Sequence, residues 1–184
     1  EWSEQGVDGS YRFLQRVWRL ADHWLPLVSD ATTAVDGGSL NATYKELFRK
    51  THETIKRVTQ DIEERFHFNT VISAVMELVN VLQAIEPSET EAAGQQAVRF
   101  AFQTTVLLLS PIVPHFCEEL WEALGHDRSV LLAPWPAYDE AATVKEEVEI
   151  VVQVNGKLRG RFPAALDADD ATLEKIALAD ERTV

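Results

Sequence analysis

The chain has 184 residues, and 17 Lys and Arg against 30 Asp and Glu give it a formal charge of −13 at pH 7. Its length suits one domain, or one domain with a small appendage, and an apolar fraction of 46% excludes wholesale disorder. The charge argues against a free-standing basic nucleic-acid binder. It is unevenly spread, however, with a net −3 over residues 1–84 and −10 over residues 85–184, so a local basic patch is not excluded.

Cys117 is the single cysteine, so the chain cannot form an internal disulfide, which fits a reducing compartment. No signal peptide opens the sequence, and no apolar run is long enough to cross a bilayer. We therefore expect a cytoplasmic protein with no membrane partner. Because the sequence starts at Glu1 without an initiator Met, we also expect it to be a piece of something longer.

Apolar residues at helical spacing dominate the sequence up to Pro136. They predict helices at about 8–27, 41–65, 70–84, 91–109 and 114–124. Pro26 is expected to end the first helix, Asn41 to cap the second, and Gly125 to follow the fifth. A break is expected near residues 66–69 and a turn at 86–89. Long helices with short connections predict an antiparallel bundle over residues 1–136.

The periodicity changes to alternation after residue 137 and predicts a hairpin at about 147–163 around Asn155-Gly156. A short helix is expected at about 168–178, with Asp167 or Asp169 near its cap. The predicted fold class is therefore mainly α, a helical bundle followed by a truncated α+β piece over residues 137–184. Because two strands are marginal alone, further strands are expected past Val184, and the hairpin is expected to be mobile or to pair with another chain, in a crystal or a dimer.

The register of the hairpin can be argued from parity. The apolar residues of both strands have even numbers, so opposed residues must have an even sum. A two-residue turn would pair Val154 with Lys157, an odd sum that sets valines against basic residues. We therefore predict a three-residue loop with a bulge and a sum of 310. This register pairs Val152 with Leu158, Val148 with Phe162 and Glu149 with Arg161.

Three groups of basic residues are candidates for contact with RNA. They are Arg12, Arg16 and Arg19 on the first helix, Lys45, Arg49 and Lys56 beside His52 on the second, and Lys157, Arg159 and Arg161 on one face of the hairpin. The alternative is that the helical groups are ordinary solvated faces and that the hairpin group protects an edge strand.

Other residues that could carry chemistry favour structural roles. His115 and Cys117 fit no zinc-binding spacing, and the adjacent Glu118 and Glu119 point in different directions on a helix. We therefore predict no catalytic and no metal-binding residue. The tryptophans at 2, 18, 24 and 121 are expected in packing contacts, and Trp135, between two prolines, is expected to pin its linker to the bundle.

Several stretches resemble bacterial-type leucyl-tRNA synthetases, in the same order. They are EWSEQGVDGSYRFLQRVWRL, HETIKRVTQDIEERFHFNTVISAVMELVNVL, SPIVPHFCEELWEALG, APWP and VVQVNGKLRGR. The Pro-x-x-Pro-His-x-x-x-Glu-Leu-Trp pattern is shared with the valine, isoleucine and methionine enzymes, whereas VQVNGKLRGR points to the leucine enzymes. The resemblance covers nearly the whole chain, but the loops at 29–39 and 86–94 look individual.

The resemblance implies a helical anticodon-binding domain that lies along the anticodon stem of tRNA(Leu), with tRNA and the remaining synthetase domains as partners. Such enzymes ligate leucine to tRNA(Leu) with ATP and Mg on a domain marked by HIGH and KMSKS motifs. Neither motif occurs here, so the chain is expected to hold no cofactor and to be inactive alone. The contacts are expected on phosphate and sugar. The alternatives are a helical protein-interaction scaffold, or the same domain of a valyl- or isoleucyl-tRNA synthetase.

Overall fold

A computed structural model of the chain describes residues 4–28, 30–65, 68–86, 91–145, 147–154, 157–166 and 168–179. The chain divides into two compact units, Glu1–Thr143 and Val144–Val184. The sequence placed this boundary after Pro136. Residues 137–143 instead belong to the first unit, because they are held against one of its helices by the contacts described below.

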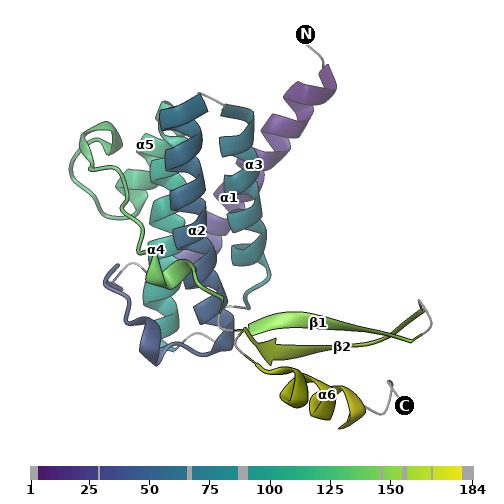
Figure 1. Cartoon of the computed structure of the whole chain (residues 1–184). Coiled ribbons are helices and arrows are strands. Elements are labelled where there is room, and N and C mark those ends of the chain that lie inside the picture. The colour runs from purple at the N-terminus through teal and green to yellow at the C-terminus, as the bar shows by residue number, and fades with distance from the viewer. Residues whose placement is uncertain are drawn as a thin grey trace. The chain divides into compact units, whose positions relative to one another are not determined.

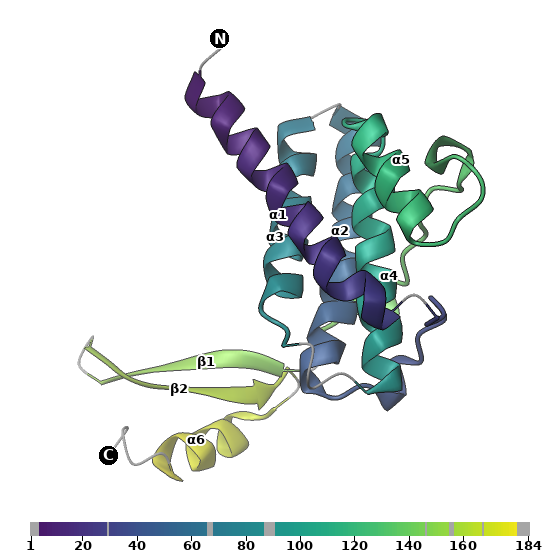
Figure 2. The same ribbon diagram turned by 180° about the vertical axis from the view of Figure 1, so that it is seen from behind.

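The first unit is built from helices, as the sequence predicted. They are α1 (Glu4–Val28), α2 (Ala42–Arg65), α3 (Phe68–Gln83), α4 (Ala92–Leu109) and α5 (Pro114–Ala123), with short 3-10 turns η1 (Gly37–Ser39), η3 (Val130–Leu132) and η4 (Ala141–Thr143). The helices α2, α3 and α4 run alongside one another, while α1 crosses them diagonally and its first turns extend past the bundle (Figures 1 and 2). The predicted mainly helical fold is thereby confirmed.

The helix ends follow from local chemistry. The side-chain oxygen of Asn41 accepts the Tyr44 N–H at 3.1 Å, which confirms Asn41 as the cap of α2. Gly125 has φ +87°, and the N–H groups of Gly125 and His126 donate to the carbonyls of Glu122 and Trp121, the pattern of a Schellman motif. Pro26 lies inside the last turn of α1 rather than after it. Residues 66–67 and 87–90 lie outside the described residues, and with them most of the expected break and turn.

The core lies where the apolar faces of the helices meet. Trp24, Leu47, Ile55, Leu78 and Phe102 are almost completely buried there. Burying each such side chain contributes roughly 1.5–3 kcal/mol. The apolar end of α4, residues 105–109, is buried as its composition predicted.

A glycine fixes the close approach of α2 and α4. A Cβ added at Gly94 would lie 2.5 Å from the aromatic ring of Tyr44. The Tyr44 side chain is 2% exposed and belongs to the core. The ring therefore occupies the space that any side chain at position 94 would need.

A buried arginine ties three helices together. Arg99 of α4 is 9% exposed. Its guanidinium donates to the carbonyl oxygen of Val28 at 2.9 Å and to that of Leu124 at 2.6 Å. Both carbonyls lie at helix C-termini, of α1 and α5, where the helix dipole is negative and carbonyls lack intrahelical partners. The sequence analysis did not single out Arg99.

The second unit consists of β1 (Glu147–Val154), β2 (Lys157–Ala165) and α6 (Asp170–Ala179). The strands pair antiparallel, and α6 packs against β2 (Figure 1). The Asp169 carboxylate accepts the Thr172 N–H at 2.9 Å, so Asp169 is the cap of α6. The pKa of Asp169 is lowered by hydrogen bonding first to the side chain and then to the N–H of Thr172. Asp167 lies outside the described residues.

The predicted hairpin register is wrong. Val154 pairs with Lys157, the pairing that the parity argument rejected, and the register shifts by one between Val152 and Gln153. Beyond the shift Val152 pairs with Gly160, and Arg159 is the extra residue of β2. The extra residue that makes the sum of paired residue numbers even therefore lies within β2, at Arg159, and not in the loop. As a result Glu149 pairs with Pro163 rather than Arg161, and Val148 with Ala164 rather than Phe162.

Candidate nucleic-acid interface

The three basic residues of α1 are not equivalent. Arg12 and Arg19 are exposed, and the Arg19 Nε donates to the Gln15 carbonyl at 3.3 Å. Arg16 is half-buried, with its guanidinium 5.5 Å from the centre of the Phe13 ring. Its Nε is buried without a hydrogen-bond partner among the described residues. The spacing that placed Arg16 with its neighbours on an outer stripe therefore overstates its exposure.

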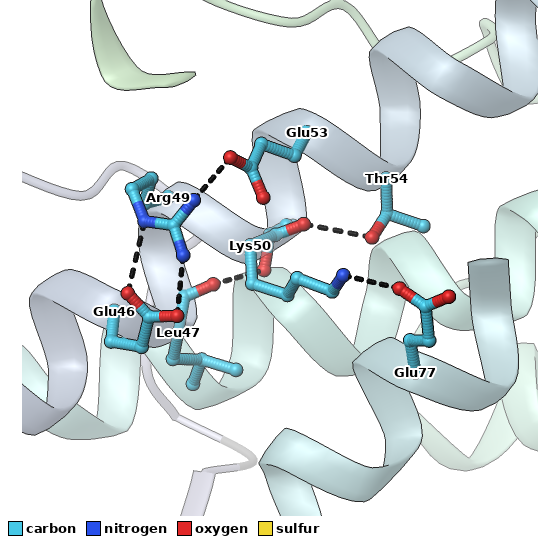
Figure 3. A network of polar contacts seen from close by, with 8 residues as sticks. Glu46, Leu47, Arg49, Lys50, Glu53, Thr54 and Glu77 are labelled. Atoms are coloured by element: carbon cyan, nitrogen blue, oxygen red, sulfur yellow. Dashed lines mark hydrogen bonds and ion pairs between the residues drawn. The ribbon is translucent and has the colours of Figure 1, made fainter. Parts of the chain in front are cut away.

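The basic residues of α2 are largely engaged with acidic neighbours. The guanidinium of Arg49 is held between the carboxylates of Glu46 and Glu53, one turn away on either side (Figure 3). Partial burial lowers the Arg49 pKa, but the hydrogen bonds and charges of the two glutamates outweigh this effect and raise it. The charge of Arg49 is therefore compensated within the helix, whereas Lys45 is exposed.

A second ion-pair cluster joins α2 to α3. Glu77 of α3 accepts from the Lys50 Nζ at 2.6 Å and from Arg57 at 3.3 Å (Figure 3 shows the Lys50 contact). The hydrogen bond from Lys50 lowers the Glu77 pKa, with smaller contributions from the charges of Lys50 and Arg57. Lys50 and Arg57 were not among the basic residues that the sequence indicated as candidates, and both are paired with Glu77.

Another face of α2 contacts the linker that follows α5. The Trp135 indole N–H donates to Thr59 Oγ1 at 2.8 Å, which confirms that Trp135 pins the linker to the bundle. The Asp139 N–H donates to His52 Nδ1 at 3.0 Å. Lys56 pairs with Glu140, and this hydrogen bond raises the Lys56 pKa. We name residues 135–143 the linker strap.

His52 is the buried centre of this arrangement. Its side chain is 6% exposed, and its ring lies 4.5 Å from the Phe48 ring and 5.2 Å from the Phe100 ring, centre to centre. Burial lowers the His52 pKa, although the charge of Asp139 opposes this effect. Since Nδ1 accepts a hydrogen bond, it carries no proton, and the ring is neutral. A neutral, buried imidazole is not a phosphate ligand, so His52 belongs to the packing of the strap.

The third group of basic residues lies on the hairpin, which belongs to the second unit. Arg159 and Arg161 are exposed, with Arg161 opposite Val151 and Arg159 at the bulge. The side chain of Lys157 lies outside the described residues. The bulge removes the strict alternation that placed the three basic residues on one face, because Arg159 is itself the extra residue of the register shift, between Lys157 and Arg161.

Cys117 and Glu118, which the sequence raised as possible catalytic or metal-binding residues, have structural roles. Cys117 is fully buried, and burial raises its pKa to about 12, so the thiol stays protonated at neutral pH. Glu118 accepts the Val130 N–H at 3.1 Å and the Ser129 hydroxyl, which fixes the turn η3 after α5. Within the described residues, no three His, Cys, Asp or Glu side chains gather into a group that could hold a metal ion.

Tryptophan packing agrees in part with the sequence analysis. Trp24 and Trp121 are buried, and Trp121 stacks on His126 with 3.8 Å between ring centres. Trp18 is 42% exposed, but its ring lies 5.9 Å from that of Phe116, so it joins α1 to α5. Trp2 lies outside the described residues.

Most of the chain matches a known class of domain. A family described as the anticodon-binding domain of tRNA ligase matches residues 44–175 of this chain. The chain therefore belongs to the anticodon-binding domain family of tRNA ligases.

None of the described helices combines the length and apolar character needed to span a bilayer.

Within this family, the similar proteins are leucine enzymes. The chain is 52% identical over 182 residues to the leucine–tRNA ligase of Geotalea daltonii, which covers 99% of this chain and 22% of that protein. The leucine–tRNA ligase of Geobacter sp. strain M21 is 53% identical, with the same coverage. The chain thus spans less than a quarter of the length of these relatives. The resemblance to leucyl-tRNA synthetases is confirmed.

A solved structure extends this similarity to three dimensions. It is the ternary complex of the Agrobacterium radiobacter K84 agnB2 leucyl-tRNA synthetase with tRNA and LeuAMS. The two chains are 28% identical, with a TM-score of 0.78, and the match covers 100% of this chain and 23% of that one. The similarity therefore includes both compact units.

Proposed function

We propose that this chain is the tRNA-docking part of a leucine–tRNA ligase that joins leucine to tRNA(Leu) with ATP. The observation that carries the proposal is the full-length structural match to a synthetase solved together with tRNA. In this role the chain holds neither ATP nor Mg and performs no chemistry. It holds the tRNA so that the acceptor end reaches a catalytic site on another domain, in the cytoplasm.

The charge distribution favours docking through narrow groups of basic residues. A body with a formal charge of −13 repels the phosphate backbone at long range, so attraction depends on local basic positions. We propose that phosphate contacts come from the exposed Arg12, Arg19, Lys45, Arg159 and Arg161, together with Lys157. Arg16 and Arg49, which the sequence also suggested, are half-buried or pair with glutamates, and we assign them fewer phosphate contacts. Lys56, also suggested by the sequence, pairs with Glu140, and we assign it no phosphate contact.

A salt titration of tRNA(Leu) binding tests the proposal. The full-length synthetase is used, because docking is spread over several domains, and deletion of this chain is compared with the intact enzyme. Logarithmic affinity should fall linearly with logarithmic salt concentration, with a slope of roughly one per phosphate contact. Removal of the chain should weaken binding and reduce the slope.

Two outcomes would contradict the proposal. One is an unchanged slope and affinity after deletion of the chain. The other is no measurable tRNA binding by the intact enzyme even at low salt. Either result would favour the alternative of a helical protein-interaction scaffold. Comparison with tRNA(Val) and tRNA(Ile) tests the choice of the leucine enzyme over its valine and isoleucine counterparts.

A further inference from the structure

The linker strap is held by three residues on one face of α2. His52, Lys56 and Thr59 are spaced by four and three residues, so they lie above one another on the helix surface. Each contacts a different part of the strap, namely the Asp139 N–H, the Glu140 carboxylate and the Trp135 indole. Lys56 also lies 5.9 Å from the centre of the Tyr138 ring. The strap is thus bound along its length and not at a single point.

The strap has internal order as well. The Asp139 carboxylate accepts the Ala141 N–H at 2.9 Å, and the Glu140 carbonyl accepts from both the N–H and the hydroxyl of Thr143. These bonds form the turn η4, which packs against α2. Asp139 therefore uses its backbone N–H to bind His52 and its side chain to shape the turn.

The second unit begins at Val144, directly after the strap ends. The three contacts with α2 therefore fix the point on the bundle from which the chain enters the second unit, which carries Arg159 and Arg161. Once a tRNA is bound to the bundle, the arginines of the second unit contact it as a tethered group. If the entry point moved freely, the effective concentration of these arginines at the tRNA would be lower.

We propose that His52, Lys56 and Thr59 are positioning residues for tRNA binding, which seat the strap and thereby the entry point of the second unit. Lys56 then acts through Glu140 and not through a phosphate. This inference rests on the proposed function, since it assumes that both units contact the same tRNA.

A matched pair of charge variants in the full-length synthetase separates the two roles of Lys56. Lys56→Gln removes a positive charge and Glu140→Gln a negative one, but both break the same ion pair. If the pair seats the strap, each variant weakens tRNA(Leu) binding by about two- to fivefold, the range expected for an exposed ion pair, with an unchanged salt slope. The double variant then weakens binding no more than either single variant.

Neutral variants supply a second measurement. His52→Phe keeps an aromatic ring between Phe48 and Phe100 but removes the acceptor of the Asp139 N–H, and Thr59→Val removes the acceptor of the indole. Both should speed amide hydrogen exchange of residues 135–143 and weaken tRNA binding by about two- to tenfold, the range expected for one hydrogen bond. Since neither changes the charge at neutral pH, loss of an ionic contact with a phosphate does not account for the weaker binding, and faster exchange in residues 135–143 ties it to the strap.

The outcomes that overturn the inference differ from those that overturn the proposed function. If Lys56→Gln lowers the salt slope by about one while Glu140→Gln leaves binding unchanged or tightens it, Lys56 is a phosphate contact. If His52→Phe speeds exchange in the strap without any loss of tRNA affinity, the seating of the strap does not contribute to tRNA binding. Failure of the unaltered synthetase to bind tRNA would instead refute the proposed function, and this inference with it.

Discussion

The guanidinium of Arg99 lies 2.6 Å from the carbonyl oxygen of Leu124, and this contact joins the middle of the bundle to the end of α5. The same side chain reaches the carbonyl of Val28 at the end of α1. A positive charge is therefore buried where two helix dipoles present their negative ends, which offsets part of the cost of its desolvation. Together with packing contacts such as Trp18 on Phe116, Arg99 joins helices that are far apart in the sequence.

Replacement of Arg99 should be strongly destabilising. In Arg99→Met the volume is nearly kept, but both carbonyls lose the guanidinium donor, and the Val28 carbonyl keeps only the Ala31 N–H. We expect a loss of about 2–4 kcal/mol in the free energy of unfolding. Chemical denaturation of the chain measures this loss. The control is Arg12→Met, at an exposed arginine of α1, which should change stability by less than about 0.5 kcal/mol. Equal effects of the two variants would refute the structural role of Arg99.

Two glycines in helices should respond in opposite ways to the same substitution. Gly94→Ala places a Cβ 2.5 Å from the buried Tyr44 ring, so the ring or the two helices must shift, and we expect a loss of about 1–3 kcal/mol. Gly9→Ala in α1 meets nothing within 4 Å and should gain about 0.5–1 kcal/mol from the higher helix propensity of alanine. Thermal denaturation of the two variants distinguishes the sites, and a gain in Gly94→Ala would contradict the close approach.

Stability should fall below pH 6.5, in part through His52. Burial lowers its pKa in the folded state below the ordinary value of 6.5. Above pH 6.5 the ring is neutral in both states, and the full stability is present. As the pH falls further, the unfolded chain binds the proton first, so the free energy of unfolding declines until the pH passes the lower folded-state pKa.

The variant His52→Phe should show a smaller decline, measured by denaturation between about pH 5 and 8. Some decline should persist, because burial and the charge of Arg99 also lower the pKa of His126. His126→Gln is the matched control for that second contribution. An identical pH dependence of His52→Phe and the unaltered protein would contradict this assignment.

The Cys117 thiol should be inert in the folded protein. It is fully buried and its pKa is raised to about 12, so almost no thiolate is present at pH 8. A disulfide reagent should therefore react only at the rate at which the protein opens. Addition of denaturant should make the reaction fast, and rapid reaction without denaturant would refute the burial of this side chain.

The exposed arginines of α1 should contribute more to tRNA binding than the paired arginine of α2. In the full-length synthetase, Arg12→Gln with Arg19→Gln should lower the salt slope of tRNA(Leu) binding by about two. Arg49→Gln should change it less, because Glu46 and Glu53 already compensate the charge of Arg49. The reverse order of effects would remove the α1 arginines from the interface.

The sequence by itself determined the helices, their caps at Asn41 and Gly125, the pinning of the linker by Trp135, and the family. The helices and their caps depend on periodicity and on short-range chemistry, which neighbouring residues specify, and the family follows from its motifs. The sequence predicted that Trp135 pins the linker, but not that its partner is Thr59, 76 positions away. The position of the hairpin bulge was not determined, since parity accepts an extra residue either in the loop or at Arg159.

Only the tertiary structure showed which basic residues are paired with glutamates from other parts of the chain. Arg49 is compensated by Glu46 and Glu53 of its own helix, but Lys50 and Lys56 are paired with glutamates of α3 and of the linker strap. In the sequence, Arg99 is a charged residue within a largely apolar helix. Its role is visible only in the folded structure, where the C-terminal ends of α1 and α5 lie beside it. Coulomb and hydrogen-bond energies depend on distance in space, and residues 27 and 84 positions apart, as in the pairs Lys50–Glu77 and Lys56–Glu140, come together only when the bundle folds.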